Sequence, residues 1–334
     1  MARPNNEFSI AWASLSGDVS DPGWRTIPVT PAGQCSLSAG RRFPGNQEAL
    51  LVGFALVSIP SAEKLPEGQG FNVERVNLPS DNRTWLALTR KESGSIELFM
   101  AMVCDIAGML DAESSSDDPR LLRVFLGRVR AWQEFMRKGA QALSPEEEIG
   151  LIGELTLLAL IIEAGVPPTL ALEAWVGPLD GIQDFEIGTG AIEVKATISP
   201  VGFPARIGSL EQLDDPIRQP LFLAGTRLRQ ISSGKNLPDF VSDLHQSITG
   251  DAEAERLLSE RLIAAGYFAG HADRYPRRFD VASTRMVEVT EGFPRLTPSR
   301  VPKGISKAMY EIDFDRVTGI NEGTAEAFKK LGAL

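Results

Sequence analysis

Residues 183–198 read QDFEIGTGAIEVKATI and carry three acidic residues and a lysine around a glycine pair. Gly188 and Gly190 flank Thr189, and glycine tolerates the positive φ angle that a tight hairpin turn needs. Apolar residues alternate with polar ones on either side of the turn, which is typical of half-buried strands. The stretch therefore predicts two short strands joined by a turn.

The alternation also predicts where the charged side chains of this hairpin point. Successive side chains of a strand point to opposite faces, so Glu193 and Lys195 should project to the same side. Asp184 opens the first strand, and the hairpin can fold it back beside them. The sequence thus predicts two carboxylates and one amine close together.

Two neighbouring carboxylates need a counter-charge. Like charges ~4 Å apart repel by roughly 4 kcal/mol at an effective dielectric constant near 20. A divalent cation between them converts that repulsion into binding, and Mg²⁺ accepts one or two carboxylates while keeping waters for substrate phosphate. A lysine beside such an ion can orient water and offset charge on a phosphate. A charged strand face exposed to solvent is the alternative interpretation of the three residues.

The segment before the hairpin predicts a helix with one unusual acidic residue. Ser144-Pro145-Glu146-Glu147 is a capping box with proline at the first helical position. The run IGLIGELTLLALIIEAG follows, and on a helix the neighbours of Glu154 are glycine or apolar. An ionised carboxylate in such surroundings needs a partner. Glu154 therefore either bonds a neighbouring loop or arginine, or points into the same site as the hairpin acids.

The rest of the C-terminal part predicts further alternating elements. We expect a helix start at 209–213, a buried strand at 220–228, a helix or helix pair at 239–265, and late strands at 281–289 and 309–314. The resulting order is helix, hairpin, strand, helix, strand. This order predicts an α/β (α+β) fold.

Several of these motifs together resemble a known family. The Asp-x8-Glu-x-Lys spacing of Asp184, Glu193 and Lys195 resembles the signature of the PD-(D/E)XK nuclease superfamily, although Gln183 stands where proline is typical. The runs GLIGELTLL, WVGP, DFE, EVKAT, IGSLEQL and FPRL look like the bacterial PD-(D/E)XK motif protein family, formerly a domain of unknown function. This resemblance covers roughly 120–314, with weaker similarity before it.

The resemblance implies a fold and a chemistry. The fold would be the restriction-endonuclease-like αβββαβ core, and the activity Mg²⁺-dependent hydrolysis of DNA phosphodiester bonds, with Mn²⁺ as a substitute ion. Asp184 and Glu193 would hold the ion with the Val194 carbonyl, and Lys195 would position the attacking water. Glutamates on the preceding helix often serve the metal in this superfamily, which implies that role for Glu154.

The resemblance also implies partners. Such proteins tend to be encoded in bacterial phage-defence or restriction gene clusters beside ATPases and methylases. No GxxxxGK[ST] motif occurs in this chain, so an energy-dependent step would need a partner protein. A homodimer is compatible with the sequence.

Five polar residues are candidates for DNA contact. Basic residues interleaved with aromatics around Tyr275 suit a nucleic-acid backbone, and they suit an ordinary loop equally well. The two residues near 209 could contact phosphate or serve the fold alone. The five candidates are Arg206, Gln212, Arg274, Arg277 and Arg278.

The first third of the chain predicts an accessory domain. Apolar strand candidates at 50–59 and 85–89 are broken by prolines, and helical spacing follows at 96–110. The acidic stretch DAESSSDD, residues 111–118, is the best candidate linker. We expect a β-rich or mixed N-terminal domain over 1–115 and the nuclease-like domain over 116–334.

Composition limits the class of protein. The 334 residues carry a net charge of −10, which argues against indiscriminate coating of nucleic acid. Residues 200–334 hold 18 basic and 18 acidic residues, so the whole excess lies in the first 199. Cys35 and Cys104 form no disulfide framework, and no signal peptide or membrane span is predicted, so we expect a cytoplasmic protein.

Two other functions remain open on the sequence alone. The chain could be a DNA-binding or scaffolding subunit of a defence complex whose nuclease fold no longer cuts. It could also be a structural adaptor with a coincidental hairpin, which would show neither Mg²⁺ dependence nor DNA affinity.

Overall fold

A computed structural model describes residues 7–17, 20–32, 35–57, 59, 64–68, 70–78, 82–113, 116–137, 141–215, 218–318 and 321–334. The chain divides into two compact units, Met1–Ala140 and Gln141–Leu334. Each unit has its own sheet and its own core.

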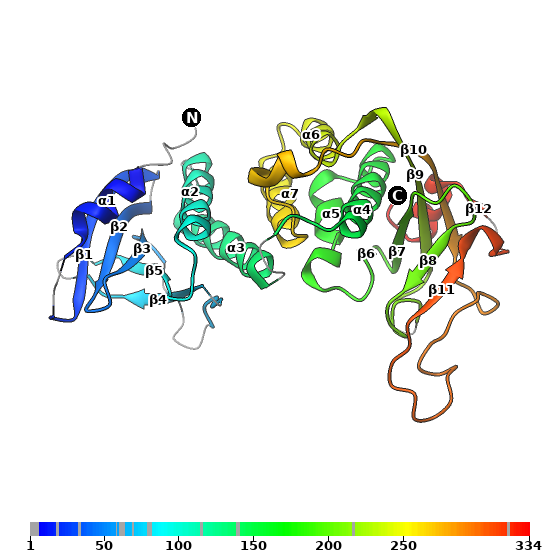
Figure 1. The fold of residues 1–334 in the computed structure, drawn as a ribbon, viewed down its shortest axis with the longest axis horizontal. Coiled ribbons are helices and arrows are strands. Elements are labelled where there is room, and N and C mark those ends of the chain that lie inside the picture. Colours follow the sequence, from blue (N-terminus) through cyan, green and yellow to red (C-terminus); the bar gives the residue numbers. More distant parts are fainter. Residues whose placement is uncertain are drawn as a thin grey trace. The chain divides into compact units, whose positions relative to one another are not determined.

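The first unit is an antiparallel sheet packed with helices. The sheet order is β1-β2-β3-β5-β4, and helix α1 packs on β1 and β2 (Figure 1). Trp12 of α1 donates its indole N–H to the Ala49 carbonyl at 2.9 Å and stacks on Phe99 of α2. The β-rich N-terminal unit expected from the sequence is present. Its elements are α1 (Glu7–Leu15), β1 (Gly23–Ala32), β2 (Cys35–Phe43), β3 (Gln47–Phe54), β4 (Phe71–Val76), β5 (Thr84–Arg90), α2 (Ile96–Ala112) and α3 (Asp118–Arg137).

Helix α3 places the boundary between the units later than the expected position after residue 115. The helix packs on α2, and its Arg128 forms a paired contact with Asp105 at 2.6 Å. Trp132 is fully buried and donates to the same carboxylate at 2.7 Å. The acidic linker therefore joins two helices of one unit, and the division falls at residues 140 and 141.

The second unit contains the predicted hairpin. The order helix, hairpin, strand, helix pair, strand is the one expected for the αβββαβ core. Its elements are α4 (Pro145–Glu163), α5 (Pro168–Ala174), η1 (Gly177–Leu179), β6 (Phe185–Ile187), β7 (Gly190–Thr197), β8 (Pro204–Ile207), β9 (Leu221–Lys235), α6 (Leu237–Ser247), α7 (Ala252–Ala264), η2 (Ala269–Arg274), β10 (Phe279–Glu288), β11 (Tyr310–Asp313), η3 (Phe314–Arg316), β12 (Asn321–Glu322) and α8 (Thr324–Lys330).

The main sheet of this unit is mixed, with the order β12-β10-β9-β7-β6. β6 and β7 are antiparallel, with Phe185 opposite Ile192, whereas β7 and β9 are parallel, with Glu193 opposite Leu223. β8 leaves this sheet and pairs with β11 in a separate two-stranded ribbon. The strand that carries Glu193 and Lys195 is thus held on both edges.

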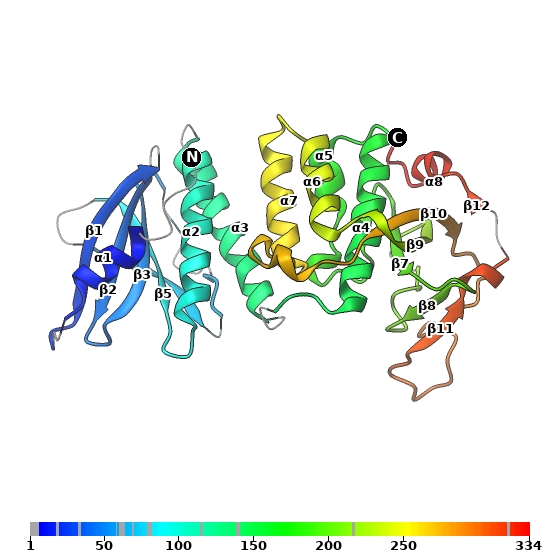
Figure 2. The same ribbon diagram turned by 45° about the horizontal axis from the view of Figure 1, so that its top comes forward.

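Two apolar clusters cover the two faces of the sheet. Ile192 and Val194 pack with α4, α5, α6 and α7, which Figure 2 shows gathered on one side of β7, β9 and β10. Ala191, on the other face, packs with Phe203 and Ala205 of the β8 region and Ile312 of β11. The two-residue period of β7 puts Glu193 and Lys195 on the side of Ala191, facing the β8–β11 ribbon.

One predicted element is wrong. Residues 209–213 form turns instead of a helix start, because Gln212 uses its side chain to accept the Gly208 N–H at 2.7 Å. A side chain that satisfies a nearby backbone group competes with helix formation. Across the described part of the chain, no helix combines the length and apolarity needed to cross a membrane.

The later boundary predicts how truncated chains behave. A fragment beginning at residue 116 keeps α3 but removes α2, so the buried side chains Leu121, Phe125 and Trp132 become exposed. We expect residues 141–334 to give a soluble fragment with one cooperative thermal transition, and 116–334 to aggregate. Size-exclusion chromatography and thermal unfolding test this, and equal behaviour of the two fragments would contradict the boundary.

Candidate functional site

Helix α4 begins at its predicted cap and lies close against the strand of the site. Ser144 and Glu147 form both halves of the capping box. A Cβ at Gly153 would come within 2.8 Å of the Ala196 Cβ, so only glycine allows this approach of α4 to β7. The close packing brings Glu154, the next residue, to the level of the hairpin.

Glu154 has a defined partner. Trp175 donates its indole N–H to Glu154 Oε2 at 2.6 Å. The indole itself is fully buried and stacks on Phe185 at 6.4 Å between ring centroids. Trp175 therefore anchors the packing beneath the hairpin, and it also orients the carboxylate.

The start of the hairpin is tied down by backbone contacts. The Asp184 carbonyl accepts the N–H groups of Val176 and Gly177 at 2.9 and 3.0 Å. An added Cβ at Gly177 would lie 2.8 Å from Asp184 Oδ1, so this glycine makes room for the carboxylate. The other oxygen, Oδ2, accepts the Val194 N–H at 2.7 Å.

The hairpin brings the three charged side chains together as expected. Lys195 Nζ lies 2.6 Å from Glu193 Oε1. The Glu193 side chain is only 1% exposed, and that of Lys195 is 19% exposed. The ammonium group of Lys195 is thus partly accessible to solvent, whereas the Glu193 carboxylate beside it is buried.

Burial and mutual repulsion shift the pKa values of these groups. Burial raises the pKa of Glu193 to about 8, the charge of Asp184 adds to the rise, and Lys195 opposes it. Burial also raises the pKa of Asp184, against the attraction of Lys195. Burial disfavours charged Lys195, but the nearby carboxylates outweigh it and raise the pKa of this amine. Glu154 acts on both Glu193 and Lys195, so the site holds three carboxylates and one ammonium and is short of positive charge.

The donor set fits a magnesium ion. Glu193 Oε2 is buried and makes no hydrogen bond with the described residues, so one carboxylate oxygen is left for a ligand. Hard oxygen donors of this kind suit Mg²⁺. The described residues hold no group of three or more histidine, cysteine or acidic side chains placed around one ion. The binding of an ion by Asp184 and Glu193, and a direct ligand role for Glu154, therefore stay predictions.

Two of the arginines predicted to contact DNA are used within the fold. Arg277 bonds Glu148 at 2.6 Å and the Pro145 carbonyl at 2.6 Å, which fixes the first turn of α4. Arg278 bonds the Gly234 carbonyl at 2.8 Å and Asp239 at 3.3 Å. Arg277 therefore holds the first turn of α4 in place, and DNA contact by either residue stays a prediction.

The other three candidates lie elsewhere. Arg274 is exposed at the end of η2, and Arg206 is exposed on β8, where it contacts Met309 Sδ at 3.8 Å. Gln212 holds its own loop together, as described above, so the structural alternative applies to it. Gln183, which directly precedes Asp184, donates to the Gln212 carbonyl at 3.4 Å, and DNA contact by Arg206, Gln212 and Arg274 stays a prediction.

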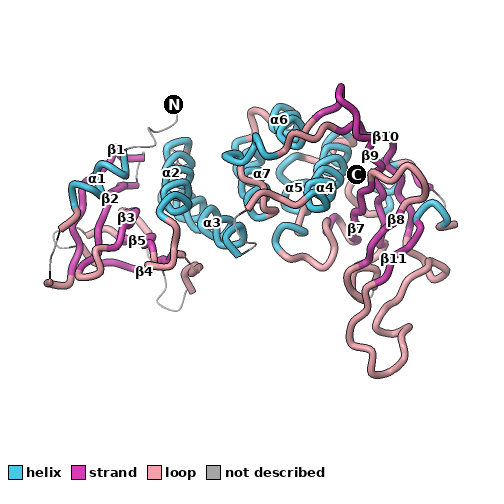
Figure 3. The backbone as a smooth tube through the Cα atoms, in the orientation of Figure 1, coloured by secondary structure: helices cyan, strands magenta, loops and turns pink. Residues whose placement is uncertain are grey.

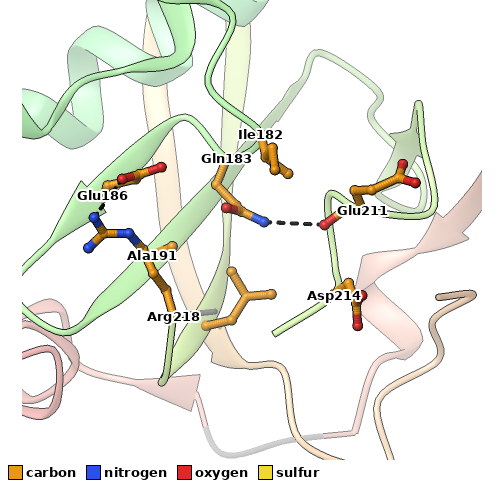
Figure 4. A pocket seen from close by; sticks show the side chains of 8 residues that line it. Ile182, Gln183, Glu186, Ala191, Glu211, Asp214 and Arg218 are labelled. Carbon is orange, nitrogen blue, oxygen red and sulfur yellow. Dashed lines mark hydrogen bonds and ion pairs between the residues drawn. The ribbon is translucent and has the colours of Figure 1, made fainter. Parts of the chain in front are cut away.

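A small cavity of about 110 Å³ opens beside the hairpin (Figure 4). Gln183 and Glu186 line it on either side of Asp184 in the sequence, but the Asp184 and Glu193 carboxylates do not. Arg218 pairs with Glu186 at 2.7 Å across one end, and Gln183 donates to the Glu211 carbonyl at 3.2 Å at the other. The residue that replaces the typical proline thus ties the hairpin to loop 211–215.

Three residues that support the site are not predictable from the sequence. The role of Gly177 depends on its tertiary approach to Asp184, which a local pattern does not predict. Trp175 gave no signal of its hydrogen bond to Glu154, because the two residues lie 21 positions apart. Arg295 of FPRL bonds the Leu213 carbonyl at 2.6 Å and Asp215 at 2.9 Å, a contact that spacing cannot predict.

The comparison with protein families agrees with this geometry. Residues 8–315 match the model of the family described as "Putative PD-(D/E)XK family member (DUF4420)". The chain belongs to this PD-(D/E)XK family. No curated protein and no solved structure matches the chain.

Membership in the PD-(D/E)XK family covers both units, since the match begins at α1 and ends in η3. The N-terminal unit is therefore part of the family's common chain. The family resemblance expected from the hairpin motif is confirmed, and the match includes the region before residue 120, where the motifs showed only weaker similarity.

The space at Gly177 gives a direct test of the site. In Gly177→Ala the new Cβ displaces Asp184 Oδ1, so Mg²⁺ and Mn²⁺ affinity should fall by roughly 10–100-fold. Isothermal titration calorimetry of the metal-free protein measures this. The control is Gly150→Ala on α4, where the added Cβ meets no atom within 4 Å and metal affinity should be unchanged. Equal affinities of the two variants would contradict the assignment.

Proposed function

We propose that this protein is a Mg²⁺-dependent DNA endonuclease of the PD-(D/E)XK type. The observation that supports it most is the arrangement of Asp184, Glu193 and Lys195 on one hairpin, with the buried Glu193 Oε2 left without a protein partner among the described residues. Family membership supports a nuclease-like protein and leaves the substrate to this proposal.

Asp184 and Glu193 would hold the ion, assisted by the Val194 carbonyl. When bound, Mg²⁺ would neutralise charge that develops on the phosphate oxygens. Mn²⁺ could substitute, because it accepts the same oxygen donors. The Val194 N–H fixes Asp184 Oδ2, so one oxygen of this carboxylate is oriented before any ligand arrives.

Lys195 would place the attacking water. Its pKa is raised, so it carries an ammonium group at neutral pH and donates hydrogen bonds instead of accepting a proton. Hydrolysis forms a bond from water oxygen to phosphorus and breaks the bond to the leaving oxygen. The water gives up a proton and the leaving oxygen gains one. An ammonium held at 2.6 Å from Glu193 can orient the water and stabilise the negative charge of the transition state.

Glu154 would support the same site from α4. Its carboxylate is held by the Trp175 indole and acts electrostatically on Glu193 and Lys195. Glu154 would act on the site through a water or a second ion. The Trp175 contact keeps this charge oriented toward the hairpin.

The cellular role is also a proposal. Kinship with the family supports work in a bacterial restriction or phage-defence system, with an ATPase or methylase as partner and DNA as substrate. Cys35 and Cys104 form no disulfide in the part of the chain that the structure describes, which is compatible with the reducing cytoplasm. A homodimer would supply two cutting sites for two strands.

Cleavage assays test the central proposal. Plasmid and linear DNA should be cut in Mg²⁺ or Mn²⁺ and left intact in EDTA. Asp184→Ala and Lys195→Ala should each lower the rate by roughly 10²–10³-fold, because each removes charge stabilisation of the transition state. Lys235→Ala, which removes a lysine paired with Asp243 on the surface, is the matched control and should cut normally.

The same assay separates the alternatives. A DNA-binding or scaffolding subunit would bind DNA without cutting it, and Lys195→Ala would change nothing. A structural adaptor would show neither DNA binding nor a thermal shift with Mg²⁺. Cleavage that persists in Asp184→Ala would show that the activity comes from a contaminant or another site.

A further inference from the structure

The segment between β10 and β11 has an unusual charge distribution. Residues 292–309, here called the basic arm, contain four basic residues and no acidic residue in a chain whose net charge is −10. The basic residues are Arg295, Arg300, Lys303 and Lys307. Figure 3 shows the segment as one long loop that extends from the β8–β11 ribbon.

The lysines of the arm differ from the others of the second unit. Lys195, Lys235, Lys329 and Lys330 each form an ion pair with a carboxylate. Among the residues that the structure describes, Lys303 and Lys307 are exposed and form no ion pair. Their charge is left for an external anion.

The base of the arm is fixed. Tyr310 accepts the Leu296 N–H at 3.0 Å, and Thr297, which is 1% exposed, accepts the backbone N–H groups of Arg300 and Val301 with its carbonyl. Arg295 binds the Leu213 carbonyl and Asp215 with a side chain that is 7% exposed. These contacts fix both ends of the arm to the second unit.

The outer part of the arm turns sharply at a lysine. The Ile305 N–H donates to the Pro302 carbonyl at 3.2 Å, and Gly304 has a φ of 101°. A positive φ at the third position is typical of a type II turn, which puts Lys303 at the corner. Ile305 and Met309 are 45% and 59% exposed, so cationic and apolar groups alternate along the arm.

The root of the arm is connected to the candidate site. Gln183, which precedes Asp184, donates to the carbonyls of Glu211 and Gln212, and Arg295 holds the next residues of the same loop. The β8–β11 ribbon that carries the arm packs over Ala191, on the face of β7 that also bears Glu193 and Lys195. Arg206, exposed on β8, contacts Met309 at the end of the arm.

We propose that the basic arm binds the phosphate backbone of duplex DNA beside the cleavage site, with Lys303 and Lys307 as the contacts. This proposal rests on the proposed function of the same unit. Charge complementarity selects a polyanion, and cations interleaved with exposed apolar side chains are typical of segments that lie along a DNA groove. The arm would compensate for the acidic charge of the rest of the chain and hold the duplex.

The salt dependence of DNA binding tests this proposal. Fluorescence anisotropy with a short labelled duplex is measured over a range of salt concentrations, using full-length protein that carries Asp184→Ala to prevent cutting. Each phosphate contact contributes about 0.9 to the slope of log K against log salt concentration. The protein that also carries Lys303→Ala and Lys307→Ala should therefore show a slope whose magnitude is smaller by about 2.

The matched control is Lys235→Ala with Lys329→Ala. It removes the same charge from exposed lysines that are already paired with Asp243 and Glu326, so the slope should stay unchanged. Equal slopes for the arm variant and the control would overturn the proposal. Slope loss seen only with single-stranded RNA, and no binding of duplex, would overturn the assignment to duplex DNA.

Cleavage measured in parallel separates this proposal from the proposed function. If the protein with an intact Asp184 cuts DNA, but Lys303→Ala with Lys307→Ala leaves the salt slope of DNA binding unchanged, the arm proposal fails and the proposed nuclease function is retained. If the slope falls by about 2 but the wild-type protein never cuts, the arm proposal stands and the catalytic assignment fails.

Discussion

The repulsion between two carboxylates on one hairpin, Asp184 and Glu193, is the constraint on which the site depends. Burial adds to that repulsion, and a single ammonium, Lys195, offsets only part of it. A protein that needed these residues only for stability would gain by replacing them with apolar groups. A divalent cation bound between Asp184 and Glu193 would relieve their repulsion. The same ion is what a PD-(D/E)XK nuclease would need for catalysis, so the fold and the proposed chemistry depend on one site.

The surrounding fold keeps the repelling groups in place. Gly153 lets α4 approach β7, and Gly177 gives Asp184 the room to turn toward the Val194 N–H. Trp175 holds Glu154 at the level of the hairpin from a fully buried position. The parallel pairing of β7 with β9 fixes the strand from its other edge. Packing energy from the two apolar clusters thus balances the electrostatic strain of the site.

Local patterns predicted much of this structure, and tertiary contacts explain what they missed. The alternation around Glu193 and the capping box at Ser144 act over a few residues, so the hairpin and α4 followed from the sequence. The unit boundary did not, because the α2–α3 contact through Asp105 and Arg128 joins residues 23 positions apart. The helix start predicted at 209–213 does not form, because the Gln212 side chain accepts the Gly208 N–H instead. The sequence leaves DNA contact and a structural role equally open for the arginines near 277, and it does not predict the bond between Arg277 and Glu148, because these residues lie 129 positions apart.

Diffraction from crystals soaked in Mn²⁺, measured at the manganese absorption edge, shows whether an ion lies between Asp184 and Glu193. The predicted result is one anomalous peak about 2.1 Å from an oxygen of Asp184 and from Glu193 Oε2. Lys195 should lie beside the peak with its ammonium still near Glu193. A map with no peak between these two carboxylates, or with Mn²⁺ bound only elsewhere, would contradict the account.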